Sequence, residues 1–362
     1  MSGGSERLCL LITGGAGFIG SNLVRRLVRE GRHLIVNLDK LSYAGNLDSL
    51  VGIEVAPLYR FEHADVADGR AVARIMERYR PDALLNLAAE THVDRSIEGP
   101  QDFIQTNVVG TTILLDAVRA YLRGPRGVRA NAALGDGGFR FLQVSTDEVF
   151  GALGPVGRFS AASPYRPNSP YAASKAAADH LARAFGRTFG LPAIVTNCTN
   201  NYGPHQFPEK LIPLAILKAE NGRAIPVYGD GLQVRDWLHV DDHVDGLLAA
   251  LFKGEPGETY VFGGEAERTN LEVVELICTI MDRCRPAGAP HRRLIEHVDD
   301  RPGHDRRYAM DIRTTVARLG WRPTARFEDG LEATVRWYLD NLAWCRRVQD
   351  GSYRGERLGL LA

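Results

Sequence analysis

The sequence has no excess of either charge, because Lys and Arg total 44 and Asp and Glu also total 44. A protein that binds nucleic acid usually carries a basic excess, so this balance argues against a nucleic-acid partner. Long apolar runs are also missing, and no stretch approaches the ~18 uninterrupted apolar residues that a membrane-spanning helix needs. We therefore expect neither a nucleic-acid partner nor a membrane partner.

Cysteine is scarce, with 5 residues in a chain of 362, and no two of them form a Cys-x-x-Cys motif. An odd number of widely spaced cysteines argues against a disulfide framework and against a zinc site, so we expect no bound metal. The N-terminal residues lack the basic region, apolar core and cleavage site of a signal peptide. Together these absences favour a reducing, cytoplasmic location.

The first half of the chain alternates short apolar runs with helical patterns. The runs predict strands over residues 8–13, 34–38, 59–63, 83–87, 139–145 and 193–198. The patterns predict helices over residues 18–30, 70–79, 101–122 and 170–189. Strands that alternate with helices of this length indicate βαβ units, and hence a parallel sheet with helices on both faces. We predict an α/β fold with a doubly wound, Rossmann-type sheet.

After about residue 200 the alternation loosens. Several prolines interrupt the chain, and short strands are predicted over residues 225–228, 259–262 and 294–297. No linker, repeat or low-complexity tract separates this half, so it reads as a smaller α/β lobe packed on the sheet. An irregular stretch over residues 123–138 is predicted to be a surface loop.

A glycine-rich turn follows the first predicted strand and precedes the first helix. Gly14, Gly17 and Gly20 have the spacing that permits a tight turn and lets a pyrophosphate approach the helix N-terminus. Asp39 ends the second predicted strand, where a carboxylate would bind the adenosine ribose 2′-hydroxyl. Because Asp39 would repel a 2′-phosphate, the pattern favours NAD over NADP. The plain alternative is a glycine turn with an unrelated surface aspartate.

Tyr171 and Lys175 lie four residues apart, one turn of the predicted helix, so they share a face. In a dinucleotide-binding chain, the Lys175 ammonium and the positive nicotinamide would favour a tyrosinate and lower the pKa of Tyr171. Lys175 has further donors that can hold the nicotinamide ribose. The alternative is an ordinary amphipathic helix with a solvated lysine.

Three polar residues, Thr146, Asp147 and Glu148, follow the fifth predicted strand. Because the carboxyl ends of parallel strands line the ligand crevice, these side chains should face the substrate. Two adjacent carboxyl groups offer an acid and a base together, which a simple dehydrogenase does not require. The alternative is that both carboxylates only cap a following turn.

These motifs together resemble the extended short-chain dehydrogenase/reductase superfamily, and within it the dTDP-glucose 4,6-dehydratases. The likeness runs over nearly the whole chain. Besides the glycine loop it rests on residues 39–46 (DKLSYAGN), 88–96 (AAETHVDRS), 145–149 (STDEV), 200–204 (NNYGP), 207–213 (FPEKLIP), 235–237 (RDW) and 300–308 (DRPGHDRRY).

The resemblance implies a hydro-lyase that converts dTDP-glucose to dTDP-4-keto-6-deoxyglucose and leaves NAD unchanged overall. It implies that Tyr171 takes the carbon-4 hydroxyl proton, with Lys175 beside it, while a hydride passes to NAD. Glu148 would then remove the carbon-5 proton, and Asp147 would protonate the departing carbon-6 hydroxyl. Thr146 would hydrogen-bond the carbon-4 oxygen, and the hydride would return to carbon 6.

The resemblance also implies two sets of ligand contacts and a homodimer formed by the helices 101–122 and 170–189. Besides Gly14, Gly17 and Gly20, the implied NAD contacts are Phe18, Ile19, Asp39, Lys40, Ser42, Asp65, Val66, Ala88, Thr106, Tyr171, Lys175 and Asn201. The implied sugar-nucleotide contacts are Thr91, Asn200, Lys210, Leu211, Pro226, Tyr228, Arg235, Asn270, Arg301 and His304. Residues 1–200 would form the NAD-binding Rossmann domain, and residues 201–362 mainly the sugar-nucleotide lobe, with some segments returning to the first domain.

Other functions stay open at this stage. A UDP-glucose 4,6-dehydratase would differ in the base it accepts, and His205, in place of a more usual aromatic residue, leaves that preference open. An epimerase or decarboxylase of the superfamily would share the glycine loop, Asp39 and Tyr171, although an epimerase has no use for an acid at carbon 6. A non-catalytic, NAD-sensing regulator would be expected to have lost catalytic groups, and this sequence keeps them.

Overall fold

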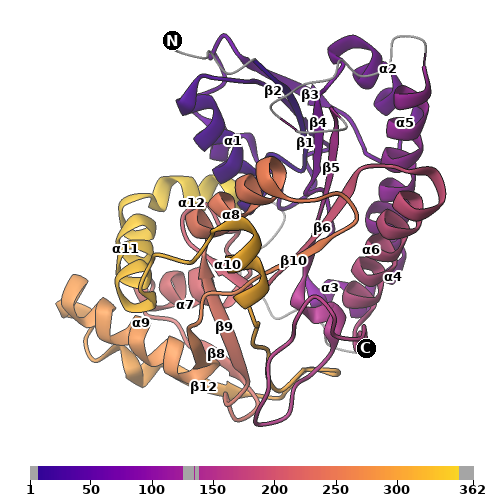
Figure 1. The fold of residues 1–362 in the computed structure, drawn as a ribbon. Helices are drawn as coiled ribbons and strands as arrows, with labels where there is room; N and C mark the ends of the chain where they lie inside the picture. Colours follow the sequence, from indigo (N-terminus) through magenta and orange to yellow (C-terminus); the bar gives the residue numbers. More distant parts are fainter. Residues whose placement is uncertain (1–6, 125–133, 135–137, 350–362) are drawn as a thin grey trace.

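The computed structural model describes residues 7–124, 134 and 138–349. Its largest element is a seven-stranded sheet in the order β10-β6-β5-β4-β1-β2-β3 (Figure 1). The strands are β1 (Cys9–Thr13), β2 (Leu34–Asp39), β3 (Tyr59–His63), β4 (Ala83–Asn86), β5 (Arg140–Thr146), β6 (Ala193–Cys198) and β10 (Thr259–Phe262). Every neighbouring pair is parallel. The predicted doubly wound α/β sheet is therefore confirmed.

Helices cover both faces of this sheet. Successive side chains of a strand point to opposite sides, and apolar side chains on both sides need a helix to pack against. Leu10 of β1 belongs to one core cluster with Leu23 of the first helix, and Leu11 belongs to the opposite cluster with Val72 of the second. The flanking helices are α1 (Phe18–Glu30), α2 (Gly69–Tyr79), α5 (Thr111–Arg123), α6 (Pro170–Phe189), α8 (Val240–Lys253) and α10 (Arg313–Leu319). In Figure 1, α2, α5 and α6 lie on one side of the sheet, and α1 and α8 lie on the other.

The helix predicted over residues 101–122 is interrupted in the structure. It consists of α4 (Pro100–Phe103), a π-helical stretch η2 (Ile104–Gly110) and α5. Short π-helical turns occur frequently at functional sites. Here Asn107 of the stretch accepts a hydrogen bond from the Glu90 amide at 2.9 Å and donates to the Glu90 carbonyl at 3.0 Å. Through these two hydrogen bonds, the π-helical stretch is attached to the segment that follows β4.

The second half of the chain contributes to both parts of the molecule. Strand β10 returns to the main sheet, where Thr259 pairs with Val195 of β6. The remaining strands form two small sheets, β11-β9-β7 and β12-β8. Their bounds are β7 (Asn200–Tyr202), β8 (Ile225–Tyr228), β9 (Val234–His239), β11 (Glu267–Thr269) and β12 (Ile295–Val298).

These small sheets pack with helices around a separate apolar core that includes Ile216, Trp237 and Tyr338. The helices are α7 (Leu211–Glu220), α9 (Asn270–Cys284), α11 (Phe327–Asp340) and α12 (Leu342–Val348). Further short helices are α3 (Val93–Glu98), η1 (Leu47–Leu50), η4 (Asp147–Phe150), η5 (Pro286–Gly288) and η6 (His291–Leu294). Most of the loop predicted over residues 123–138 lies outside the described residues.

Within the described ranges, no helix combines the length and the apolar character that a membrane crossing requires. The cysteines Cys9, Cys198, Cys278, Cys284 and Cys345 are all free, so the structure contains no disulfide among them.

Candidate active site

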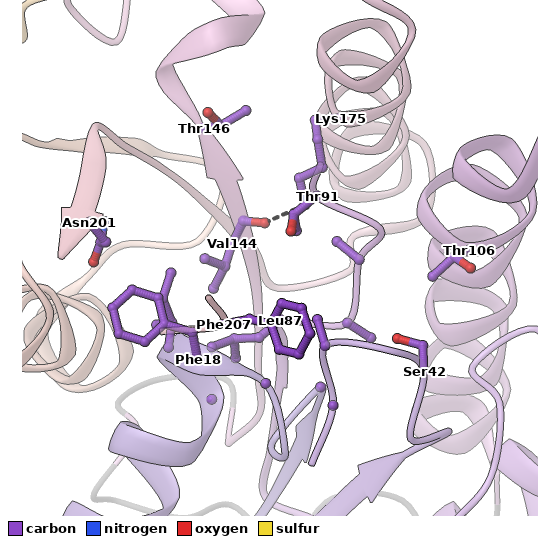
Figure 2. A pocket seen from close by; sticks show the side chains of 18 of the residues that line it. Phe18, Ser42, Leu87, Thr91, Thr106, Val144, Thr146, Lys175, Asn201 and Phe207 are labelled. Atoms are coloured by element: carbon purple, nitrogen blue, oxygen red, sulfur yellow. Dashed lines mark hydrogen bonds between the residues drawn. The ribbon is translucent and has the colours of Figure 1, made fainter. Parts of the chain in front are cut away.

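A pocket lies at the carboxyl edge of the main sheet, where the glycine loop meets the ends of β2, β4 and β5 and one side of α6 (Figure 2). It is lined by all five predicted catalytic residues: Thr146, Asp147, Glu148, Tyr171 and Lys175. The predicted cofactor residues that line it as well are Gly14, Gly17, Phe18, Ile19, Gly20, Asp39, Lys40, Ser42, Val66, Ala88, Thr106 and Asn201. Open parallel sheets bind ligands at this edge.

The glycine loop fits a dinucleotide because it leaves backbone exposed where side chains would stand. Gly14 has a φ of +70°, and a Cβ at this position would lie 2.7 Å from the backbone nitrogen of Ala88. A Cβ on Gly20 would collide with the carbonyl oxygen of Gly14. Gly17 precedes α1 without a side-chain cap, so the first N–H groups of α1 stay available for a pyrophosphate.

Asp39 is held at the end of β2 by the loop itself. Its Oδ2 accepts a hydrogen bond from the Ala16 amide at 2.9 Å, and its Oδ1 accepts one from the Leu41 amide at 2.8 Å. An ionised carboxylate has about four acceptor sites, so capacity remains for a ribose hydroxyl. Burial raises the pKa of Asp39, and these two amides oppose that rise.

Lys40 occupies the next position and connects three segments around the pocket. Its Nζ donates to the Thr106 hydroxyl at 2.8 Å and pairs with Glu90 at 3.2 Å. Asp65 is the one predicted cofactor residue that does not line the pocket; its carboxylate lies 3.9 Å from the Lys40 ammonium.

The end of β5 carries the carboxyl pair. Thr146 caps the short helix η4, because its hydroxyl accepts a hydrogen bond from the Glu148 amide at 3.3 Å. Asp147 is 1% exposed, and its Oδ2 has no hydrogen-bond partner among the described residues. The alternative that these carboxylates only cap a turn does not apply, because the cap is Thr146 and the carboxylates face the pocket.

The two carboxyl groups experience different surroundings. Burial, reinforced by the charge of Glu148, raises the pKa of Asp147 to about 8. Burial also raises the pKa of Glu148, but the nearby cations Arg301, Arg235 and Lys210 oppose that rise. At neutral pH Asp147 is therefore mainly protonated, whereas the cations favour ionised Glu148. Neighbouring carboxyl groups that differ in this way are suited to act as acid and base.

Tyr171 and Lys175 face the same pocket from α6, as predicted. The Lys175 Nζ donates to the Val144 carbonyl at 2.7 Å, an interaction visible in Figure 2. The prediction that the protein's own groups lower the pKa of Tyr171 is wrong. Burial and the charge of Glu148 raise this pKa well above its ordinary value. Burial also lowers the pKa of Lys175. The Thr146 side chain opposes the rise in the Tyr171 pKa, and a positive nicotinamide ring would favour the tyrosinate further.

The predicted sugar-nucleotide residues divide into two groups. Thr91, Asn200 and Lys210 line the pocket. The others lie outside its lining, in or next to the small sheets: Leu211, Pro226, Tyr228, Arg235, Asn270, Arg301 and His304. Among these, Arg235 is 5% exposed, and its guanidinium donates hydrogen bonds to the carbonyls of Val234 and Asp305 rather than to a carboxylate. Its charge is thus available to an anionic ligand.

Sequence reasoning assigned no role to several buried acids that support the site, among them Asp179 and Glu209. Asp179 lies one turn after Lys175, accepts a hydrogen bond from the Tyr165 hydroxyl at 2.8 Å, and raises the pKa of Lys175 against the effect of burial. Its four-residue spacing from Lys175 was the available signal. Glu209 accepts hydrogen bonds from Tyr43 at 3.0 Å and Arg95 at 3.3 Å. Only its position beside Lys210 in the sequence could have indicated it.

Comparison with known proteins agrees with this site. A family model described as GDP-mannose 4,6 dehydratase matches residues 11–334. The dTDP-glucose 4,6-dehydratase of Xanthomonas campestris pv. campestris is 56% identical over 351 residues, which cover 96% of this chain and 98% of that protein. The chain therefore belongs to the GDP-mannose 4,6 dehydratase family of the extended short-chain dehydrogenase/reductases. Within that family it is similar over its whole fold to the dTDP-glucose 4,6-dehydratases, which are hydro-lyases.

Solved structures give the same result. The dTDP-glucose 4,6-dehydratase of Streptomyces venezuelae, crystallised with NAD bound, superimposes with a TM-score of 0.84 at 42% identity, covering 94% of this chain and 100% of that one. The UDP-glucose 4-epimerase of Thermotoga maritima has a TM-score of 0.80 but 27% identity, covering 92% of this chain and 100% of that one. The fold is thus shared with epimerases, and the sequence is closer to the dehydratases.

Proposed function

We propose that this chain uses NAD to dehydrate dTDP-glucose to dTDP-4-keto-6-deoxyglucose. The proposal rests on Asp147 and Glu148, which line one pocket with Tyr171 and Lys175. Burial raises the pKa of Asp147 and favours its protonated form, whereas three cations oppose the rise in the pKa of Glu148. Oxidation alone needs only the tyrosine and the lysine. An acid and a base beside them supply what an elimination requires.

In the first step, Tyr171 receives the proton of the carbon-4 hydroxyl. Lys175 holds its ammonium beside β5, and Thr146 offers its hydroxyl to the carbon-4 oxygen. When bound, NAD would supply the hydride acceptor and donor that the side chains lack. The glycine loop and Asp39 would hold the cofactor's pyrophosphate and ribose.

In the second step, the 4-keto group makes the carbon-5 proton acidic, and Glu148 removes it. Asp147 delivers its proton to the departing carbon-6 hydroxyl, so that water leaves without a free hydroxide. Glu148 then returns its proton to carbon 5 as carbon 6 is reduced, and the proton that Tyr171 received replaces the one that Asp147 gave up. A buried acid with a pKa of about 8 retains its proton at neutral pH, which suits it to this delivery.

Incubation of the purified protein with dTDP-glucose tests this function. We expect mass spectrometry to show a product lighter by one water, formed in many turnovers without added NAD or with only catalytic amounts. Stoichiometric accumulation of NADH would contradict the proposal, because the hydride must return to the same sugar. An epimerised sugar of unchanged mass would favour the epimerase alternative instead.

We also propose the partner and location that the sequence predicted. Ile104 and Val109 of the π-helical stretch are 49% and 37% exposed, and Phe189 at the end of α6 is 37% exposed, which supports a homodimer through these helices. A monomer in sedimentation at micromolar concentration would contradict this. Five free cysteines support a reducing cytoplasm, which cell fractionation tests. Residues 1–200 would hold NAD, and residues 201–362 mainly the nucleotide sugar.

A further inference from the structure

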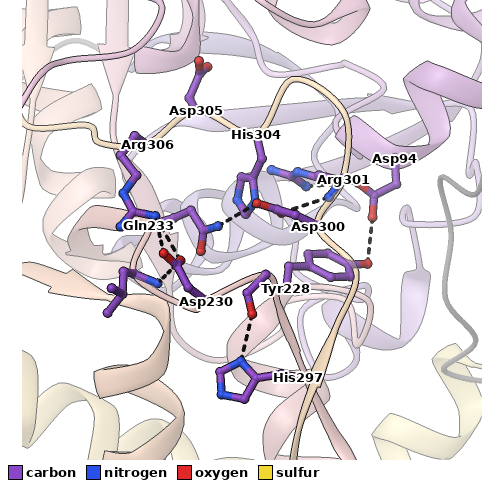
Figure 3. A network of polar contacts seen from close by, with 12 residues as sticks. Asp94, Tyr228, Asp230, Gln233, His297, Asp300, Arg301, His304, Asp305 and Arg306 are labelled. Atoms are coloured by element: carbon purple, nitrogen blue, oxygen red, sulfur yellow. Dashed lines mark hydrogen bonds and ion pairs between the residues drawn. The ribbon is translucent and has the colours of Figure 1, made fainter.

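Asp94 of α3 is a buried acid to which the sequence assigned no role. It is 2% exposed, and both of its oxygens bind side chains from the C-terminal lobe (Figure 3). Its Oδ1 accepts a hydrogen bond from a terminal nitrogen of Arg301 at 3.0 Å, and its Oδ2 accepts one from the Tyr228 hydroxyl at 3.1 Å. One carboxylate of the cofactor-binding half thus holds two residues that the family resemblance assigns to the sugar nucleotide.

A second acid of this network, Asp300, binds groups other than the Arg301 guanidinium. Asp300 accepts hydrogen bonds from Gln233 at 2.9 Å and His304 at 2.6 Å, and from the backbone amide rather than the guanidinium of Arg301. Among the described residues, Asp94 is therefore the carboxylate that pairs with the Arg301 side chain. The Arg301 Nε is buried and has no acceptor in the part of the chain that the structure describes, so a donor remains for an oxygen of a ligand.

Arg301 also affects the catalytic carboxylate. It is the strongest of the cations that oppose the burial-induced rise in the Glu148 pKa. Charged and titratable groups from several elements act on Arg301 or Glu148: His92, Asp94, Asp147, Tyr171, Lys210, Arg235, His304, Asp305 and Tyr308. Asp94 is the member of this set that fixes the guanidinium by a direct hydrogen bond.

We propose that Asp94 is a positioning residue for the nucleotide-sugar site. It holds Arg301 and Tyr228 in the orientation that receives the diphosphate of the substrate and keeps the Arg301 charge near Glu148. A mobile guanidinium would lose orientation entropy on binding, whereas one already held by a buried carboxylate does not. This inference rests on the proposed function, because it concerns the site that binds dTDP-glucose.

The test uses Asp94→Asn in the full-length protein. The change keeps the shape of the side chain but removes the charge that faces Arg301. Asp230→Asn is the matched control, because Asp230 also pairs with an arginine, Arg306 at 2.9 Å, in the same network but with both side chains about half exposed. Such an exposed ion pair contributes little to the stability of the protein. Tyr228→Phe, which deletes one hydroxyl, serves as a second and milder variant.

We expect Asp94→Asn to raise the KM for dTDP-glucose and the Kd for dTDP, measured by calorimetry, by about 10- to 100-fold, the effect of losing a charged hydrogen bond. The kcat at the optimum pH should stay near that of the wild type. The acid limb of the kcat profile should move to higher pH, because a displaced Arg301 no longer favours ionised Glu148. Tyr228→Phe should raise KM by a smaller factor, and Asp230→Asn should change nothing.

Three results would overturn the proposal. Unchanged KM, Kd and pH profile with only a lower melting temperature would make Asp94 a structural brace. Tighter binding of dTDP to Asp94→Asn would mean that Asp94 competes with the ligand for Arg301. A change of equal size in Asp230→Asn would show a general charge effect. Failure of the proposed function is distinguishable, since the wild-type protein would then not dehydrate dTDP-glucose at all.

Discussion

Replacing either member of the carboxyl pair separates dehydration from simple oxidation. Glu148→Gln keeps the size of the side chain but cannot accept the carbon-5 proton, and Asp147→Asn cannot deliver a proton to the leaving hydroxyl. Burial and the charge of Glu148 raise the pKa of Asp147 to about 8, so Asp147 is mainly protonated at pH 7, the form that an acid requires. A positioned acid or base contributes about 10²–10⁴-fold, and we expect each variant to lose dehydration by that factor.

The assay follows absorbance of NADH at the same time as product formation. In both carboxyl variants, oxidation at carbon 4 still has Tyr171 and Lys175, so NADH should rise transiently with little dehydrated product. Tyr171→Phe should suppress the NADH signal itself, because the carbon-4 hydroxyl then has no base. The exposed Asp230→Asn serves again as a control for loss of a carboxylate.

Two results would contradict the roles assigned to Asp147 and Glu148. Near wild-type dehydration in Glu148→Gln and Asp147→Asn would remove the roles assigned to both groups. Loss of the NADH signal in these variants, to the same extent as in Tyr171→Phe, would place the carboxyl groups in the oxidation step. Far-ultraviolet circular dichroism of each variant checks that the fold is intact, so that lost activity is assigned to the chemistry.

The remaining predictions concern the cofactor loop, stability and the base. Gly14→Ala should weaken NAD binding and lower the melting temperature. The φ of +70° is unfavourable for alanine, and the new Cβ would lie 2.7 Å from the backbone nitrogen of Ala88. Unchanged NAD affinity in a fluorescence titration would contradict this prediction. Folding raises the pKa of Asp147 from 3.8 to about 8. Ionisation of Asp147 therefore destabilises the folded protein increasingly as the pH rises from 3.8 to about 8. Asp147→Asn should therefore melt at a higher temperature than the wild type at pH 8, and the gap should close towards pH 4. One methyl group is worth ~1–3 kcal/mol in an apolar pocket, so kcat/KM should favour dTDP-glucose over UDP-glucose; equal values would remove the thymine preference.

The main sheet was predictable because its signals are local. Each buried parallel strand is a short apolar run, and the glycine loop lies directly between β1 and α1. The first six strands therefore end within one residue of their predicted bounds. The helix over residues 101–122 was predicted as continuous because residues 104–110 keep helical periodicity, and the pattern does not distinguish a π-helical turn from an α-helical one.

The catalytic groups were predictable for the same reason, whereas their ionisation was not. Tyr171 and Lys175 share one helix turn, and Asp147 and Glu148 are neighbours in the chain. The pKa of Tyr171 depends on Glu148, which comes from a different element, and on burial that only the folded chain creates. Adjacent residues reveal which chemistry is available, but the sum of distant charges decides which protonation state each group holds.

The support of the site comes from pairs that no local pattern connects. Arg301 and Asp94 are 207 residues apart, and Tyr43 and Glu209 are 166 apart, yet each pair is in hydrogen-bond contact. Both contacts join the N-terminal half of the chain to its C-terminal half, beside the site proposed for the sugar nucleotide. A site built at such a junction requires its charges to be held from both sides, because a cation fixed by only one lobe would move with that lobe. The long-range pairs are therefore the part of the site that must be tested by substitution, and Asp94 is the position at which one change reaches both Arg301 and Tyr228.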